Sequence, residues 1–289
     1  MSECTSDCST CSSDCSSRQG AQDFAAHLAE GSTVKHVYAV MSGKGGVGKS
    51  LVTSMLASAF SAKGYRTAIL DADLTGPSIP KSFGVKREEL MVTGGVDGDD
   101  STALLVPPVS SNGVRIISGN LLVENEDDPI VWRGSLIASA VKQFYSEVFW
   151  DDIDYMFVDM PPGTGDVPLT VFQSLPVEGI IMVTSPQDLV SMIVSKAVKM
   201  AKEMDIPVIG IVENMSYFEC PDNGIRYNIF GDSHIDEVAA KYGINVLAKL
   251  PIEPDTARLV DQGRAAELDL SPMEEAVKLI TAVSGFKKN

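Results

Sequence analysis

Positive charge, long apolar runs and cysteine are all scarce in this sequence. Its 289 residues carry 23 Lys and Arg against 39 Asp and Glu, which gives a formal net charge of −16. Proteins that bind nucleic acid need a basic surface, so this balance argues against a nucleic-acid partner and a DNA-partitioning role. No apolar run approaches the roughly 20 residues that span a bilayer, so we expect no membrane partner.

The start of the sequence lacks the features of a secretory signal. It reads Met-Ser-Glu-Cys and has neither a basic region nor an apolar core. We therefore expect a cytoplasmic protein, whose thiols stay reduced.

Cysteine is concentrated in one short segment. Four of the five cysteines lie in residues 1–20, which are rich in Ser and Thr and almost devoid of large apolar side chains. Such a segment cannot bury a core, so we expect it to be flexible without a ligand. The organisation predicted is a Cys-rich metal-binding segment over 1–20 and an α/β domain over 21–289.

The spacing of these cysteines, C-x3-C-x2-C-x3-C, suggests a metal site rather than disulfides in a reducing compartment. The thiols belong to Cys4, Cys8, Cys11 and Cys15. Soft thiolates select iron–sulfur clusters or zinc, and the C-x2-C core suits either. The alternative is a tail whose cysteines are incidental and bind no metal.

A glycine-rich stretch between a β-rich run and a helical pattern organises the rest of the chain. Residues 34–40 read as a strand and residues 51–63 as a helix, and Gly43 and Gly48-Lys49-Ser50 fit G-x-x-x-x-G-K-[ST] between them. Backbone N–H groups and the helix N-terminus would cradle phosphates there. Lys49 would reach the outer phosphates, and the Ser50 hydroxyl would bind Mg²⁺. The residues expected to contact the nucleotide are Gly43, Lys44, Gly45, Gly46, Val47, Gly48, Lys49, Ser50 and Leu51.

Two further predicted strands end in acids. Residues 66–70 lead into Asp71 and Asp73, and residues 154–158 lead into Asp159. Open α/β sheets bind ligands at the carboxyl ends of their strands. We expect Asp159 to hold Mg²⁺ with assistance from Asp71, and Asp73 to position and polarise water. The sequence Met-Pro-Pro-Gly-Thr-Gly-Asp after Asp159 reads as a switch loop near the γ-phosphate.

Alternating strands and helices predict an α/β fold with a doubly wound, mostly parallel sheet. Asn214, at the end of one predicted strand, could read an adenine edge with its amide or could simply be a turn residue. The further elements expected are strands over 179–184, 207–212 and 245–250, helices over 22–30, 135–149, 188–203 and 274–286, and a strand pair, 102–106 with 114–117, around a turn at Asn112-Gly113.

The second lysine of the loop narrows the choice among groups of P-loop proteins. Lys44 directly follows Gly43, and this arrangement resembles the deviant P-loop of the MinD/ParA/nitrogenase-iron-protein group. The resemblance implies that Lys44 crosses a dimer interface to the partner's nucleotide. The plainer alternative is a solvated surface lysine.

Four motifs together closely resemble the Mrp/ApbC family from about residue 34 to the C-terminus. They are the deviant P-loop over 43–50, Asp-Leu-Thr-Gly-Pro-Ser-Ile-Pro over 73–80, Asp-Met-Pro-Pro-Gly-Thr-Gly-Asp over 159–166 and Glu-Asn-Met-Ser over 213–216. The resemblance implies a homodimeric P-loop ATPase that uses ATP and Mg²⁺ and passes an iron–sulfur cluster, taken to be 4Fe-4S, to apoproteins.

Two positions depart from the family pattern. The family's bridging cluster is usually held by a C-x-x-C pair from each subunit; Cys220 matches the first position, but Asn223 stands at the second. Cys220 could therefore supply only partial ligation, and the cluster could lie wholly on the four N-terminal cysteines. Leu51 stands where members often have Ser or Thr, so a hydroxyl contact to the α-phosphate is missing and nucleotide affinity could be lower.

The leading hypothesis is an iron–sulfur cluster carrier whose slow ATP hydrolysis serves as a switch. Its rivals are a nucleotide-gated scaffold or adaptor with a zinc-binding or metal-free tail, and a MinD-like positioning ATPase. The acidic charge and the cation-poor C-terminal helix disfavour the last of these.

Overall fold

A central, almost wholly parallel sheet organises the computed structural model, which describes residues 25–74, 76, 78–93, 103–123, 134–163, 165–186 and 190–286. Each strand is parallel to its neighbours in the sheet, except that β9 (Arg226–Tyr227) runs antiparallel to β8. In sheet order the strands are β10 (Asn245–Pro251), β8 (Val208–Glu219), β7 (Gly179–Thr184), β1 (Thr33–Ser42), β6 (Asp152–Asp159), β2 (Thr67–Asp71) and β5 (Arg115–Ser118).

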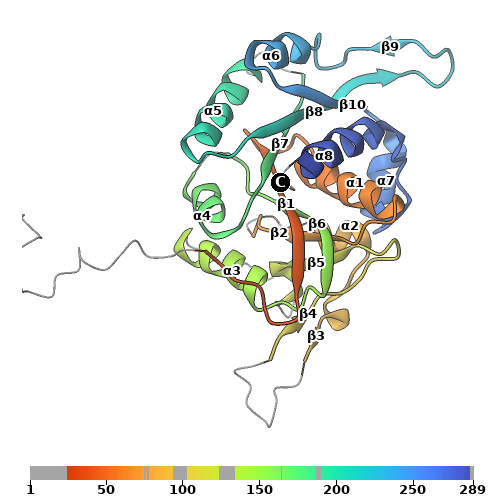
Figure 1. The fold of residues 1–289 in the computed structure, drawn as a ribbon. Helices are drawn as coiled ribbons and strands as arrows, with labels where there is room; N and C mark the ends of the chain where they lie inside the picture. Colours follow the sequence, from red (N-terminus) through yellow and green to blue (C-terminus); the bar gives the residue numbers. More distant parts are fainter. Residues whose placement is uncertain are drawn as a thin grey trace, which may run out of the picture.

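Helices cover both faces of the sheet (Figure 1). One face packs against α3 (Gly134–Ser146), α4 (Asp166–Ser174), α5 (Val190–Glu203) and α6 (Ile235–Tyr242). The other packs against α1 (Lys49–Ala62), α2 (Ile79–Phe83), α7 (Pro254–Asp261) and α8 (Glu274–Phe286). Short 3-10 turns lie at Arg87–Glu89, Gly119–Leu121, Ala265–Glu267 and Ser271–Met273. The predicted doubly wound α/β fold is confirmed.

The central strands are apolar along their length because both of their faces are covered. Every residue of β7 is buried. Successive side chains of a strand point to opposite faces, so Ile180 joins the core beneath α3 to α6 and Ile181 joins the core beneath α1 and α8. The two cores together hold the strand ends at one edge of the sheet.

The structure corrects one predicted strand pair. β4 (Leu105–Val106) pairs with β3 (Met91–Val92), whereas β5 joins the main sheet beside β2. The turn before β5 does form, since the Gly113 N–H donates to the Ser110 carbonyl at 2.9 Å. The prediction failed because β5 carries buried Ile116 and Ile117, whose side chains enter the two opposite cores.

Helix boundaries also differ from the sequence patterns. Residues 25–30 of the predicted helix over 22–30 are not helical, and the Ala26 N–H instead donates to the Ser174 carbonyl at 2.8 Å. The helix predicted over 135–149 ends at Ser146, because the following residues bridge to Leu105. In the described part of the chain, no helix is long and apolar enough to cross a membrane.

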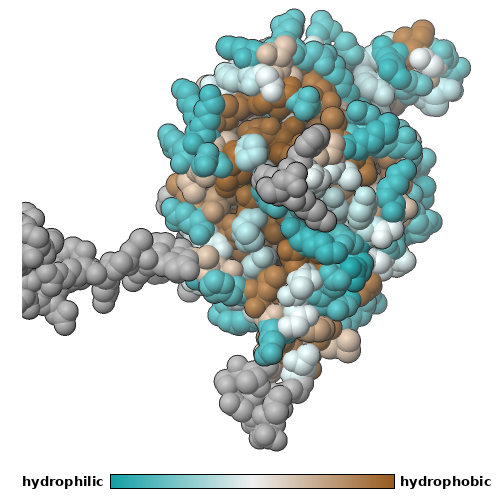
Figure 2. Space-filling model, in the orientation of Figure 1, coloured by the Kyte–Doolittle hydropathy of each residue, from teal (hydrophilic) through white to brown (hydrophobic). Residues whose placement is uncertain are grey.

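A hairpin made of β8 and β9 projects from one side of the body (Figure 1). β8 continues well past the predicted strand end to Glu219, and Cys220 begins the turn at the tip. Figure 2 shows hydrophobic and hydrophilic surface mixed on this projection. Its exposed large hydrophobic residues are Ile225, Tyr227, Ile229 and Phe230.

Candidate functional site

The glycine-rich loop lies between β1 and α1 at the carboxyl edge of the sheet, as predicted. Gly46 and Gly48 have φ of 78° and 81°, a left-handed conformation that favours glycine. Gly43 is required for a different reason, because a Cβ there would lie 2.0 Å from Cγ2 of Ile193 on α5. The loop therefore needs glycine for two reasons, namely backbone freedom and close packing.

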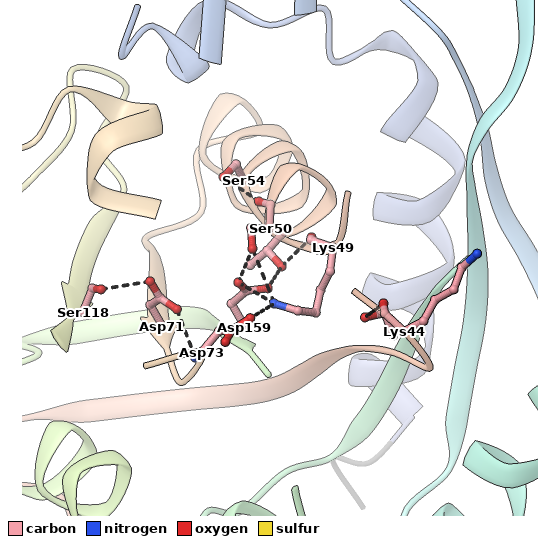
Figure 3. Close-up of polar contacts among 10 residues, drawn as sticks. Lys44, Lys49, Ser50, Ser54, Asp71, Asp73, Ser118 and Asp159 are labelled. Atoms are coloured by element: carbon pink, nitrogen blue, oxygen red, sulfur yellow. Dashed lines mark hydrogen bonds and ion pairs between the residues drawn. The ribbon is translucent and has the colours of Figure 1, made fainter. Parts of the chain in front are cut away.

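Lys49 is the centre of a charged cluster under this loop (Figure 3). Its side chain is only 6% exposed, and its Nζ lies 2.8 Å from Asp159 Oδ2 and 3.4 Å from Asp73 Oδ2. The three residues come from α1, the end of β6 and the segment after β2. The structure thus joins two acid-ended segments to the lysine that the motif singled out.

Asp159 is held by two hydroxyl groups of α1. Ser50 Oγ donates to its Oδ2 at 2.6 Å, and Thr53 Oγ1 lies 2.7 Å from its Oδ1. Sequence analysis missed Thr53. Its position four residues after Lys49, one turn along the same helix face, was the signal that could have found it.

Asp71 lies behind the cluster. It is fully buried and accepts hydrogen bonds from Ser118 Oγ at 2.9 Å and from the Asp73 N–H at 3.1 Å. Burial, reinforced by the nearby Asp159 carboxylate, raises the pKa of Asp71 from 3.8 to about 8. Ser118 was also missed, because only the pairing of β5 with β2 brings it beside Asp71.

Replacing Asp71 with asparagine should flatten the pH dependence of stability. The folded-state pKa exceeds the unfolded value, so the folded protein holds a proton that the unfolded chain releases. This contribution to the free energy of unfolding is fully present below about pH 4 and is lost as pH rises towards about 8. Asparagine stays neutral and keeps an acceptor for Asp73 and a donor for Ser118.

Urea unfolding in EDTA at pH 6 and 8.5 measures the effect. Asp71→Asn should lose less stability than the wild type between the two pH values, and exposed Asp222→Asn should behave like the wild type. An equal loss in wild type and Asp71→Asn would contradict the assignment.

A hollow of about 290 Å³ opens above the cluster. We call it the P-loop pocket; its lining includes Gly45, Gly48, Lys49, Ser50 and Asp73, with Asp71 buried behind. A second, largely apolar hollow of about 620 Å³, the apolar pocket, shares Leu51 with it. The lining of the apolar pocket includes Asn214, Phe218, Phe230, Ile252 and Val260. The two pockets lie side by side, so the P-loop pocket offers a site for an anion and the apolar pocket offers a site for a flat apolar group.

Lys44 points away from the carboxylates (Figure 3). Its backbone carbonyl accepts a hydrogen bond from Ser42 Oγ at 3.0 Å, and the adjoining Ser42 carbonyl accepts one from the Gly163 N–H of the switch loop at 2.8 Å. The switch loop is therefore hydrogen-bonded to the last residue of β1, directly before the P-loop.

Asn214 is buried beneath the P-loop. Its Nδ2 donates to the Val47 carbonyl at 3.0 Å, and its Oδ1 accepts from the Met215 N–H at 2.9 Å. It also lines the apolar pocket. The sequence left open whether Asn214 contacts adenine or is simply a turn residue. That contact stays a prediction.

The cysteines predicted to bind a metal fall into two groups. Cys4, Cys8, Cys11 and Cys15 lie outside the described residues. Cys220 is half-buried at the tip of the β8–β9 hairpin. Asn223, which stands at the second family position, uses its Oδ1 to accept from the Ile225 N–H at 2.9 Å. Across the described part of the chain, no group of three or more His, Cys, Asp or Glu could hold a metal ion.

The parallel sheet, the P-loop with its buried lysine and the acid at the end of β6 define a P-loop NTPase. The model of the ParA family, described as NUBPL iron-transfer P-loop NTPases, matches residues 33–284. The chain belongs to this family, and the resemblance that its motifs indicated is confirmed.

Named relatives support the same assignment. An iron-sulfur cluster carrier protein of Clostridium perfringens is 42% identical over 234 residues, which cover 81% of this chain and 82% of the relative. One of Methanocaldococcus jannaschii is 37% identical over 289 residues and covers 98% of this chain and 97% of the relative.

Solved structures agree. A nucleotide-binding protein of Archaeoglobus fulgidus in complex with ADP is 40% identical, with a TM-score of 0.70 and coverage of 81% of this chain and 88% of that one. The Pyrococcus furiosus cell division ATPase MinD is 17% identical, with a TM-score of 0.58 and coverage of 86% and 99%, and shares the fold.

Proposed function

We propose that this protein is an ATP-hydrolysing carrier that binds an iron–sulfur cluster and transfers it to apoproteins in the cytoplasm. The observation that carries the proposal is the buried Lys49 between Asp73 and Asp159, in a chain whose relatives include iron-sulfur cluster carrier proteins along nearly its full length. The ADP complex of the Archaeoglobus relative supports a nucleotide in the P-loop pocket.

Phosphoryl transfer to water needs positioning and charge neutralisation more than covalent catalysis. Lys49 exchanges its carboxylate partners for phosphate oxygens, and Asp73, which lines the P-loop pocket, positions and polarises the attacking water. Ser50 Oγ and Asp159 Oδ2, 2.6 Å apart, are oxygen donors of the kind that fit Mg²⁺. When bound, Mg²⁺ neutralises charge on the outer phosphates.

Hydrolysis is slow and acts as a switch. The chain forms a homodimer in which Lys44 reaches the nucleotide of the partner, so that turnover depends on dimer closure. Within one chain, the bond from the Gly163 N–H to the Ser42 carbonyl joins the switch loop to the end of β1 next to the P-loop, so a change at the phosphates acts on both loops.

The cargo is a 4Fe-4S cluster held by Cys4, Cys8, Cys11 and Cys15 in residues 1–20, and residues 21–289 form the ATPase domain. Four thiolates complete a cluster of this type. Cys220 is a secondary ligand at most, because Asn223 already serves as a turn acceptor in the hairpin. The competing function, a nucleotide-gated scaffold with a zinc-binding or metal-free tail, predicts no bound iron.

Anaerobic reconstitution with iron and sulfide tests the cargo. The full-length protein should gain the broad visible absorption of an iron–sulfur cluster and, once reduced, an EPR signal. Replacing Cys4, Cys8, Cys11 and Cys15 by serine should abolish both, because a single cysteine remains in the chain.

Cys220→Ser is the matched control and should retain most of the cluster. A wild type that binds no iron would favour the scaffold. A cluster that survives the fourfold replacement would move the site to Cys220.

A further inference from the structure

We propose that Thr53 is a positioning residue for the metal site. It holds one oxygen of Asp159, so that the other oxygen stays directed at Ser50 when the nucleotide binds. The inference rests on the proposed binding of ATP with Mg²⁺ and goes beyond it, because Thr53 lies outside the glycine-rich motif.

The two oxygens of the Asp159 carboxylate have different partners. Oδ2 accepts a hydrogen bond from Ser50 Oγ at 2.6 Å and lies 2.8 Å from Lys49 Nζ (Figure 3). Oδ1 lies 2.7 Å from Thr53 Oγ1. Asp159 and Thr53 are both fully buried, so bulk water does not replace a donor that is lost there. Within the described part of the chain, these three side chains hold the carboxylate.

The Thr53 hydroxyl donates to the carboxylate and not only to its own helix. Its Oγ1 also lies 3.0 Å from the Lys49 carbonyl, a contact that threonine often makes inside a helix. A hydroxyl has a single proton, and bonds to ionised carboxylates are shorter and stronger than bonds between neutral groups. The contact with Asp159 is the shorter of the two, so the proton is directed at Asp159.

Nucleotide binding changes the partners of Oδ2 but not the partner of Oδ1. In the proposed mechanism, Lys49 moves from the carboxylates to phosphate oxygens, and Ser50 Oγ and Asp159 Oδ2 become ligands of Mg²⁺. Both bonds at Oδ2 are then given up. Thr53 is buried and is not among the described residues that line the P-loop pocket, so its bond remains. Of the described side chains, it is therefore the one that holds Asp159 in both states.

The bond also fixes the sheet against the helix that carries Lys49. Asp159 is the last residue of β6, and Thr53 lies one turn into α1. Without the hydroxyl, Ser50 would still hold Asp159 as long as no metal is bound. Once Mg²⁺ takes that interaction, the carboxylate would have to be ordered without a protein donor. Loss of the hydroxyl should therefore weaken binding of ATP with Mg²⁺ and spare binding without metal.

Binding of a non-hydrolysable ATP analogue to the full-length protein, in Mg²⁺ and in EDTA, tests the proposal. Thr53→Val removes the hydroxyl at nearly constant volume, and Thr53→Ser keeps it. Isothermal titration should show about tenfold weaker binding by Thr53→Val in Mg²⁺, the equivalent of one hydrogen bond to a charged group. In EDTA this variant should have the wild-type affinity. Thr53→Ser should match the wild type in both solutions.

Thr281→Val is the matched control. Thr281 lies on α8, and its Oγ1 donates to the Val277 carbonyl at 2.7 Å, four residues earlier in the helix. The change therefore removes the same kind of helix contact without touching Asp159. This variant should bind the analogue as the wild type does, both in Mg²⁺ and in EDTA.

The comparison between the two solutions decides the outcome. Equal losses in Mg²⁺ and in EDTA would show that Thr53 supports the P-loop and not the metal site, and would overturn the proposal. Unchanged affinity in Thr53→Val would overturn it too, as would Thr53→Ser binding as weakly as Thr53→Val, since the hydroxyl would then not restore the site. Where binding in EDTA is too weak to titrate, the loss in Mg²⁺ and its recovery in Thr53→Ser decide.

Two further readings of the same titrations separate other causes. The number of sites per chain distinguishes a weakened site from a partly unfolded protein. Wild-type protein that does not bind the analogue, or that binds it equally well with and without Mg²⁺, would refute the proposed nucleotide or metal binding itself.

Discussion

Lys49→Ala should lower the rate of ATP hydrolysis by about a hundredfold or more, the usual loss when one preorganised charge-stabilising donor is removed. Lys49 is the buried cation between Asp73 and Asp159, and we propose that it meets the outer phosphates. Without it, the carboxylates would repel both one another and the nucleotide. Phosphate release under saturating ATP measures the effect.

Lys63→Ala is the matched control, since this exposed lysine directly follows the same helix. It should hydrolyse ATP at the wild-type rate. Circular dichroism should show that Lys49→Ala remains folded, although its thermal midpoint should fall because Asp159 loses its buried ion-pair partner. Hydrolysis at the wild-type rate in Lys49→Ala would refute the site assignment.

Gly48→Ala is expected to weaken ATP binding by roughly a hundredfold. A left-handed conformation costs an alanine about 1–2 kcal/mol, and Gly48 has a φ of 81°. The free loop of the variant should therefore relax out of this conformation, and ATP binding would have to restore it. The new methyl group would also meet Asn214 Nδ2 at 2.1 Å and displace it from Val47, at a cost of about 1 kcal/mol for the lost hydrogen bond. Equilibrium titration with a fluorescent ATP analogue measures the loss.

Gly64→Ala separates the two causes. Gly64 has a φ of 86°, but a Cβ there would meet nothing within 4 Å, and it lies at the opposite end of α1. This variant should lose stability without losing ATP affinity. Adding Asn214→Ala to Gly48→Ala removes the steric conflict and should leave a combined loss smaller than the product of the two single losses. Wild-type affinity in Gly48→Ala would contradict the loop geometry.

Much of the fold was predictable because local patterns and tertiary burial agree. β7 and α8 have the predicted bounds, 179–184 and 274–286, since each is a continuous apolar or amphipathic run between clear turns. The strand pair predicted around Asn112-Gly113 failed because a local turn signal says nothing about which distant strand an apolar segment joins. β5 pairs with β2, more than 40 residues earlier in the chain.

The residues of the site likewise fall into some that the sequence predicted and some that it did not. Lys49, Ser50 and the nearby glycines were found because the P-loop is contiguous in sequence, and their chemistry depends on a fixed spacing. Ser118 was not found, because its contact with Asp71 depends on the order of strands in the sheet. The bond between Asn214 and Val47 joins residues 167 positions apart, so no local pattern contains it.

By itself, the sequence determined the class of this protein: a doubly wound P-loop NTPase with a deviant lysine, acid-ended strands and a cysteine-rich start. These features are local, because they depend only on residue type and spacing. Only the tertiary structure decided how the glycine-rich stretch becomes a site, with Asp159 held by Ser50 and Thr53, Asp71 buried and its pKa raised, and Asn214 pressed beneath Gly48. Burial and contacts between strands distant in sequence set those properties, because desolvation and hydrogen bonding depend on what surrounds a group in space.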